Sequence, residues 1–127
     1  MSEQQSQAKI LLIDDDPYTL GILEGLLTKN DYVVHPSPNG KFGAYLAQRY
    51  LPDLILLDVM MPGMVGYRVC RELKNDPEMK SAFVLFLTAR NGNETESTVI
   101  RSGGDDLISK PFDPKDLRAR IKAALGD

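Results

Sequence analysis

Polar residues stand at the ends of four apolar segments, and their types fit phosphoryl chemistry. Asp14 and Asp15 follow one apolar run, and Asp58, Thr88 and Lys110 follow three others. Three carboxylates brought together repel one another and need a cation, and an all-oxygen ligand set suits Mg²⁺. With the metal bound, one carboxylate can attack phosphorus, while an ammonium and a hydroxyl contact the phosphoryl oxygens. The set therefore predicts a phosphoryl-accepting site with Mg²⁺ as cofactor.

Each of these residues alone also has an ordinary structural explanation. A strand-end Asp is often a helix cap, a strand-end Thr a turn residue and a strand-end Lys a solvated charge. Asp16, which precedes Pro17, is assigned mainly to capping. Chance rarely delivers complementary groups at four segment ends, which favours the joint functional interpretation.

The segment before Asp58 is predicted to be the central strand of a sheet. Leu54 to Leu57 shows no polar alternation and is too short for a typical helix, so both of its faces should be covered. Pro52 and the pair Pro62-Gly63 bound it. The other expected strands are 9–13, 32–35, 83–87 and 107–109, and Pro36 to Gly40 reads as a turn-rich link.

Apolar residues at helical spacing predict helices between and after these strands. Asp16 should cap the first helix and Asp113 the last, and the loop between Gly63 and Gly66 is expected to be flexible. The fourth helix, within 91–102, has a weak apolar face and should be the most mobile. The expected apolar faces are Leu20, Ile22, Leu23, Leu26 and Leu27; Phe42, Tyr45, Leu46 and Tyr50; Val69, Cys70 and Leu73; Val99 and Ile100; and Leu117, Ile121 and Leu125.

Alternating strands and helices imply right-handed crossovers and a parallel sheet with helices on both faces. The fold class is thus α/β, a three-layer, flavodoxin-like, doubly wound (βα)5 domain. The pattern leaves the strand order open. The order 2-1-3-4-5 would place the first and third strands side by side and bring Asp14, Asp15 and Asp58 together at the carboxyl edge.

Size and composition indicate one globular domain. The chain has 127 residues, 43% hydrophobic and 26% charged. The net charge of −3 argues against direct nucleic-acid binding, and no apolar stretch approaches the roughly 20 residues of a membrane span. We expect a cytoplasmic protein with a disordered tail over residues 1–8 and the domain over 9–127. Cys70 is expected to be a buried hydrophobe and His35 an incidental surface residue.

The chain resembles the response-regulator receiver domains of two-component phosphorelay signalling. The resemblance runs from about Lys9 to Leu125 and is carried by Ile13-Asp14-Asp15-Asp16-Pro17, by Asp53 to Gly63, by Leu87-Thr88-Ala89, and by Gly104-Asp105-Asp106 with Lys110-Pro111-Phe112. It implies a switch that takes a phosphoryl group from a sensor histidine kinase or a His phosphotransfer protein. The change would then be relayed through the face formed by helix 4, strand 5 and helix 5, to an effector domain or protein.

The resemblance also assigns roles to single residues. It makes Asp58 the phosphoacceptor, with Mg²⁺ held directly by Asp15, Asp58 and the backbone carbonyl of Met60, and by Asp14 mostly through water. Thr88, with Ala89 beside it, and Lys110 would bind the phosphoryl group. A cis peptide is implied between Lys110 and Pro111. Such a domain is no enzyme beyond its own phosphotransfer and slow autodephosphorylation.

Some positions depart from the usual pattern of this family. Leu107 stands where an aromatic switch residue is usual, so the response is expected in helix 4 rather than in a side-chain flip. Met60 and Arg90 stand at positions that shape the approach of the hydrolytic water, and self-dephosphorylation is expected to be slower than in a Met60→Asn, Arg90→Glu variant. Asp106 and Arg120 fit a dimer charge pattern, but Glu96 does not, so dimerisation is left open and not favoured.

Two other classes of protein remain as alternatives. A haloacid-dehalogenase-like phosphatase shares the residue types, but there the acidic pair follows the lysine, and this chain has no length for a cap domain. A receiver-like interaction module that works without phosphorylation would not need the full set of Asp, Thr and Lys. For the main interpretation, the kinase should dock on an apolar patch of Leu20, Pro111 and Phe112, away from Lys74.

Overall fold

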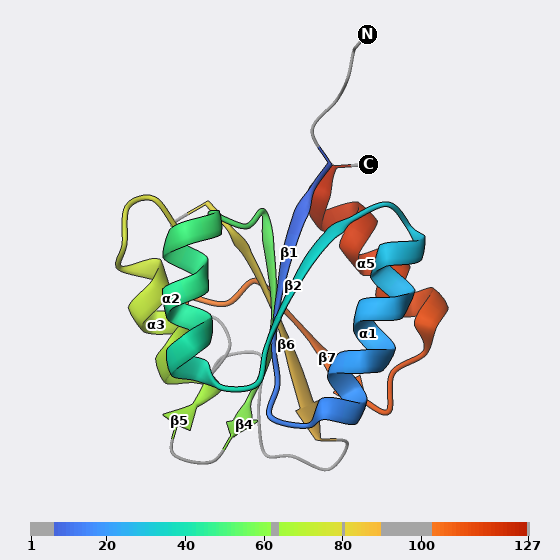
Figure 1. The fold of residues 1–127 in the computed structure, drawn as a ribbon, viewed down its shortest axis with the longest axis horizontal. Helices are drawn as coiled ribbons and strands as arrows, with labels where there is room; N and C mark the ends of the chain where they lie inside the picture. The colour runs from blue at the N-terminus through green and yellow to red at the C-terminus, as the bar shows by residue number, and fades with distance from the viewer. Residues whose placement is uncertain (1–6, 62–63, 80, 90–102, 127) are drawn as a thin grey trace, which may run out of the picture.

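A five-stranded parallel sheet forms the middle layer of the domain (Figure 1). The computed structural model describes residues 7–61, 64–79, 81–89 and 103–126. The strand order is β2-β1-β3-β6-β7, which is the expected 2-1-3-4-5 arrangement counted over this sheet. Helices α2 and α3 cover one face and α1 and α5 the other, so the three-layer α/β prediction is confirmed (Figure 1).

The strands lie where the sequence pattern predicts them, although β2, β6 and β7 extend beyond their predicted ends. β3 lies at the centre of the sheet, and all five of its residues are buried. A short antiparallel pair that the sequence did not predict, β4 and β5, follows β3 at the carboxyl edge (Figure 1). The strands are β1 Lys9–Ile13, β2 Val33–Ser37, β3 Leu54–Asp58, β4 Met60–Met61, β5 Met64–Val65, β6 Phe83–Ala89 and β7 Asp106–Lys110.

Helix ends follow the expected capping chemistry. Asp16 caps α1 by accepting a hydrogen bond from the Tyr18 N–H, and Asp113 caps α5 in the same way from Lys115. The cap of α2 was not predicted from the sequence. It is Asn39, whose side chain accepts a hydrogen bond from the Phe42 N–H at 2.7 Å. The helices are α1 Pro17–Lys29, α2 Gly40–Tyr50, α3 Gly66–Lys74 and α5 Pro114–Leu125.

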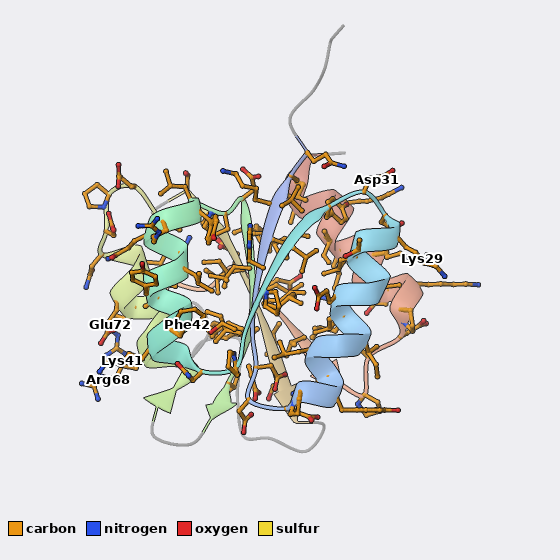
Figure 2. All side chains as sticks on the ribbon, viewed as in Figure 1. Lys29, Asp31, Lys41, Phe42, Arg68 and Glu72 are labelled. Atoms are coloured by element: carbon orange, nitrogen blue, oxygen red, sulfur yellow. The ribbon has the colours of Figure 1, made fainter. Side chains whose placement is uncertain are left out.

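Two apolar cores lie on opposite faces of the sheet, because successive strand residues point to opposite sides (Figure 2). Leu11 and Ile55 belong to the core under α2 and α3, and Ile10 and Leu54 to the core under α1 and α5. Cys70 is fully buried in the first core, as expected. The central strand thus holds Asp58 on a support that is packed from both sides.

The second strand is longer than expected. It runs through Pro36 to Ser37, whereas the sequence pattern ended it at His35 and placed Pro36 in a turn. Pro36 is tolerated because β2 is an edge strand of the sheet, where one side of the backbone needs no donor. His35 is half-buried and stacks on Tyr50 with ring centroids 3.9 Å apart, so it is more than an incidental surface residue.

The apolar face predicted for α2 is largely wrong. Of its four residues only Leu46 is buried, while Tyr45 is 52% exposed. The helix instead presents Gly43 and Ala47 to the sheet, because small residues allow close approach to β1. In α1, likewise, Ile22 is 47% exposed and does not join the core.

Several predictions fall on residues outside the described ranges. They are the tail over 1–6, the Pro62-Gly63 turn, Arg90 and the helix expected within 91–102, with its Glu96, Val99 and Ile100. The division into a tail over 1–8 and a domain over 9–127 stays a prediction.

Candidate functional site

The three expected carboxylates meet at the carboxyl edge of the sheet. Asp14 directly follows β1 and Asp58 ends β3, and these strands are neighbours in register, with Ile13 opposite Leu57. One carboxylate oxygen from each of Asp14, Asp15 and Asp58 lies within 4.8 Å of the others. Asp14 and Asp58 are 1% and 6% exposed, while Asp15 is open to solvent. Two of the three carboxylates are thus buried, and the third is accessible to solvent.

Lys110 reaches this cluster from the end of β7. Its Nζ lies 2.8 Å from Oδ2 of Asp14 and 3.7 Å from Oδ1 of Asp58. Burial works to lower the pKa of Lys110, but the hydrogen bond that its ammonium donates to Asp14 and the charges of Asp14, Asp58 and Asp16 outweigh it, so the pKa is raised. Lys110 is therefore cationic at neutral pH and offsets part of the carboxylate charge.

Asp14 has hydrogen-bond donors on both of its oxygens. Oδ1 accepts from the Asp16 backbone N–H at 2.9 Å, and Oδ2 accepts from Lys110. Asp16 itself turns away to cap α1. Its pKa is lowered, first by the hydrogen bond from the Thr19 hydroxyl and then by the Tyr18 N–H. The capping assignment of Asp16 is confirmed, and the local turn fixes the orientation of Asp14.

Thr88 and Ala89 complete the edge from β6. Asp58 lies opposite Leu87 in the sheet, so Thr88 is one residue beyond the acid on the neighbouring strand. Thr88 is 4% exposed, and Ala89 is in register with Lys110. The peptide bond between Lys110 and Pro111 is cis. The expected site residues of β1, β3, β6 and β7 are thus brought to one edge.

Gly66 supports the acidic site in a way that the sequence reading missed. A Cβ on this residue would collide with the backbone carbonyl oxygen of Asp58 and lie 2.9 Å from Cα of Val59. The Gly66 N–H also donates to the Val59 carbonyl at 2.7 Å. The sequence reading took Gly66 as an end of a flexible loop, but it begins α3 and packs on the backbone of Asp58. The sequence feature that could have indicated this role is a glycine shortly after Asp58, the acid at the end of the strand.

The donor set fits a hard divalent cation. All three side chains offer oxygen, and their three negative charges face the single ammonium of Lys110. Asp14 accepts one hydrogen bond on each of its oxygens, and an ion bound directly to it would compete with these donors, whereas Asp15 is open to solvent. Zn²⁺ would favour His or Cys, neither of which belongs to this cluster.

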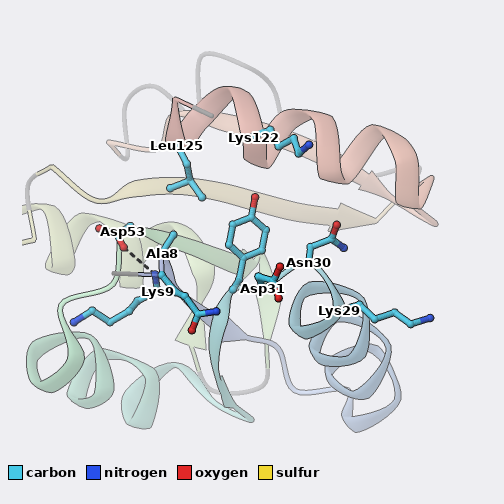
Figure 3. Close-up of a pocket in the computed structure, with 10 residues that line it drawn as sticks. Ala8, Lys9, Lys29, Asn30, Asp31, Asp53, Lys122 and Leu125 are labelled. Carbon is cyan, nitrogen blue, oxygen red and sulfur yellow. Dashed lines mark hydrogen bonds between the residues drawn. The ribbon is translucent and has the colours of Figure 1, made fainter. Parts of the chain in front are cut away.

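A cavity lies at the opposite edge of the sheet (Figure 3). Its volume is about 790 Å³, and Lys9, Asp31, Asp53 and Lys122 are among its lining. The Lys9 backbone N–H donates to Asp53 at 2.8 Å, and the Lys9 ammonium donates to the Tyr50 carbonyl. Its lining includes none of the residues of the acidic site, so the two are separate.

The expected docking patch is only partly present. Leu20 is 8% exposed because it packs with Leu23 and Leu27 in the core under α1. Pro111 is exposed and Phe112 half-buried. Lys74, which lies away from the expected patch, is a poor choice for a control substitution. Its ammonium donates to the Ala82 carbonyl and lies 3.5 Å from Asp105.

Fold and site together define a doubly wound α/β domain with an acidic pocket and a lysine at the carboxyl edge. A family model described as the response regulator receiver domain matches residues 10–122. The chain therefore belongs to the receiver domain family of two-component response regulators, whose members are signalling modules rather than true enzymes. The alternative of a haloacid-dehalogenase-like phosphatase is therefore wrong, because that phosphatase belongs to a different family.

Relatives and solved structures agree with this assignment. The chain is 41% identical to the response regulator PleD of Caulobacter vibrioides over 91% of its own length and 26% of that protein. A response regulator structure from Chloroflexus aurantiacus superposes with a TM-score of 0.89 at 30% identity, covering 96% of this chain and all of that one.

The receiver domain of the sensor histidine kinase PA1611 from Pseudomonas aeruginosa has a TM-score of 0.86 at 25% identity, again over 96% of this chain and all of that one. That structure has a magnesium ion coordinated in its active-site cleft. Among the described residues, no helix is long and apolar enough to cross a membrane. The chain spans less than two thirds of the length of its curated relatives.

Proposed function

We propose that this domain is a phosphorylation-dependent switch in which Asp58 accepts a phosphoryl group from a histidine kinase or a His phosphotransfer protein. The observation that carries the proposal is the site itself. Three carboxylate oxygens lie within 4.8 Å of one another, with the Lys110 ammonium 3.7 Å from Asp58. Transfer breaks the P–N bond of a phosphohistidine, forms a P–O bond to Asp58, and leaves the electron pair on the histidine nitrogen.

Mg²⁺ is the proposed cofactor, held by Asp15, Asp58 and the Met60 carbonyl, with Asp14 acting mostly through water. The two hydrogen bonds on Asp14 support this division. When bound, the ion supplies positive charge to the transferring phosphoryl group. Lys110 adds a second positive charge, and Thr88 and Ala89 offer a hydroxyl and a backbone N–H at the neighbouring strand end.

The readout is proposed to run through the face formed by the fourth helix, β7 and α5. Leu107 packs against the core under α2 and α3, and its carbonyl accepts from Arg120 of α5 at 3.2 Å. Thr88 is in register with Ser109 of β7, so movement at Thr88 would act directly on this strand. Three further points stay predictions: the slower self-dephosphorylation relative to a Met60→Asn, Arg90→Glu variant, the cytoplasmic location and the effector partner.

Dimerisation through this face is not favoured. Arg120 is paired within the chain, with Asp106 at 3.0 Å and Asp116 at 3.2 Å. A symmetric dimer that used these charges would have to break both pairs, and partly exposed ion pairs gain little on exchange.

Phosphoryl incorporation tests the central step. Wild-type protein incubated with labelled acetyl phosphate and Mg²⁺ should gain one acid-labile phosphate, and Asp58→Asn should gain none. Glu24→Gln, which removes an exposed carboxylate from α1, is the matched control and should behave as wild type. Label that survives in Asp58→Asn, or no label in the wild type, would contradict the proposal; the second result favours a module that works without phosphorylation.

Kinase docking is proposed on the amino end of α1 and on Pro111. Tyr18 is 76% exposed there and replaces Leu20 as the apolar anchor. Tyr18→Ala should slow transfer from a phosphorylated kinase while leaving labelling by acetyl phosphate unchanged. The control is Arg68→Glu on α3, whose side chain is 74% exposed on the other layer. Equal transfer rates to Tyr18→Ala and wild type would remove Tyr18 from the docking surface.

A further inference from the structure

Exposed apolar side chains gather around α2. Among the described residues, six large hydrophobic side chains are exposed, and four of them lie within ten positions of one another on this helix and its end. These four are Phe42 at 44%, Tyr45 at 52%, Tyr50 at 39% and Leu51 at 43%. Tyr50 stacks on His35, whereas Phe42 and Tyr45 contact each other. Single exposed hydrophobes need no explanation, but adjacent ones can mark a contact surface.

Phe42, Tyr45 and Arg49 form one stripe along the outer side of α2, because they are spaced by three and four residues. The rings of Phe42 and Tyr45 are 6.0 Å apart at an interplanar angle of 19°. The Arg49 guanidinium carbon lies 5.8 Å from the Tyr45 ring centroid. We call these three residues, together with Lys41, the α2 stripe.

The α2 stripe also carries positive charge on a chain whose net charge is negative. The whole sequence has 18 acidic residues and a net charge of −3, but residues 32–52 contain no Asp or Glu. Lys41 extends away from the sheet, on the same side of the molecule as Arg68 and Glu72 of α3 (Figure 2). Glu72 is paired with Arg68 at 3.7 Å, so it does little to neutralise the cations of the stripe.

We propose that the α2 stripe is a docking site for an acidic, amphipathic helical segment of a partner protein. The aromatic rings would take the apolar side of such a helix, and Lys41 and Arg49 would pair with carboxylates along its rim. A polyanion such as RNA or an anionic membrane fits less well. Two cations release few counterions, and the net negative charge of the domain repels a large anionic surface.

The stripe lies on the layer opposite α1, the helix proposed for kinase docking (Figure 1). Partner binding at α2 and phosphoryl transfer to Asp58 can therefore occur together. The proposal goes beyond the phosphorylation switch and does not depend on it. A variant of the α2 stripe should accept phosphate from acetyl phosphate as wild type does, which separates the failure of one proposal from that of the other.

A displayed library of random helical peptides can test the docking site. Selection against the wild-type domain, followed by counter-selection against the double variant Phe42→Ala/Tyr45→Ala, should enrich peptides with acidic and apolar residues at helical spacing. Their binding should weaken by roughly tenfold or more in that variant and in Lys41→Glu/Arg49→Glu. Ile22→Ala/Lys29→Glu, a matched apolar and charge change on α1, should leave binding unchanged. Added salt should weaken it.

Three results would overturn the proposal. One is enrichment of basic or uncharged peptides, and a second is equal loss of binding in the α1 control. The third is self-association of the wild type, seen by sedimentation and absent from the stripe variants, which would make a second copy the occupant. Circular dichroism and labelling by acetyl phosphate verify that each variant is folded.

Discussion

Lys110 places one positive charge beside the carboxylates that would hold a metal ion. Its ammonium contacts Asp14 and lies 3.7 Å from Asp58, so it would repel a cation held by Asp15 and Asp58. We expect Lys110→Met to bind Mg²⁺ more tightly, by severalfold to about tenfold, because the repulsion between ammonium and metal is removed. The same variant should take up phosphate more slowly. Calorimetric titration with MgCl₂ measures the first effect, and weaker binding than in wild type would contradict it.

The raised pKa of Lys110 also predicts how stability depends on pH. Because the folded state holds this proton more tightly than the unfolded state, the contribution is fully present below the ordinary pKa of 10.5 and is lost as pH rises through the higher folded value. The difference in unfolding free energy between wild type and Lys110→Met should be constant from neutral pH to mildly alkaline pH. It should change above that range. Urea titrations across the range measure it, and a change confined to acid pH would be inconsistent.

Two helix glycines, at the scale of elements, should respond in opposite directions to the same substitution. A Cβ at Gly43 of α2 would lie 2.5 Å from Cδ1 of Ile13, whereas one at Gly25 of α1 would meet nothing within 4 Å. Gly43→Ala should lower the free energy of unfolding by about 1–3 kcal/mol through overpacking. Gly25→Ala should raise it by about 0.5–1 kcal/mol through helix propensity. Thermal and urea unfolding measure both, and stabilisation of both variants would show that β1 yields easily.

Elements with strong local signals were predictable from sequence, and those set by close packing were not. β3 and the caps at Asp16 and Asp113 follow directly from apolar runs and turn chemistry. The buried face of α2 was predicted wrongly because the large residues suggested a core, whereas Gly43 and Ala47 approach the sheet. Such contacts between distant segments of the chain cannot be predicted from the periodicity of apolar residues within one helix.

The candidate site shows the same division. The residue types at four strand ends indicated which side chains would meet, and the register of β1 with β3 brings Asp14 beside Asp58. The support from Gly66 was missed, because it depends on how α3 returns to the end of β3. The residue types at strand ends can be predicted to form a site from short stretches of sequence. The packing of the backbone that supports the site cannot be predicted in this way.

For the whole molecule, the acidic site should couple metal binding to global stability. The folded domain gathers three carboxylates that the unfolded chain keeps apart, so Mg²⁺ should bind mainly the folded state. At ten times its dissociation constant, Mg²⁺ should add about 1.4 kcal/mol to the free energy of unfolding. For a domain of this size the melting temperature would rise by roughly 3–6 °C.

The variant Asp15→Asn distinguishes this coupling from a general salt effect. Removing one of the three charges should stabilise the metal-free domain by relieving repulsion, and should also reduce the gain from Mg²⁺, because a ligand is lost. Glu24→Gln removes an exposed charge from α1 and should keep the full response to Mg²⁺. KCl at matched ionic strength accounts for screening. An equal rise in melting temperature for wild type, Asp15→Asn and Glu24→Gln would show that the ion acts elsewhere than at the three carboxylates.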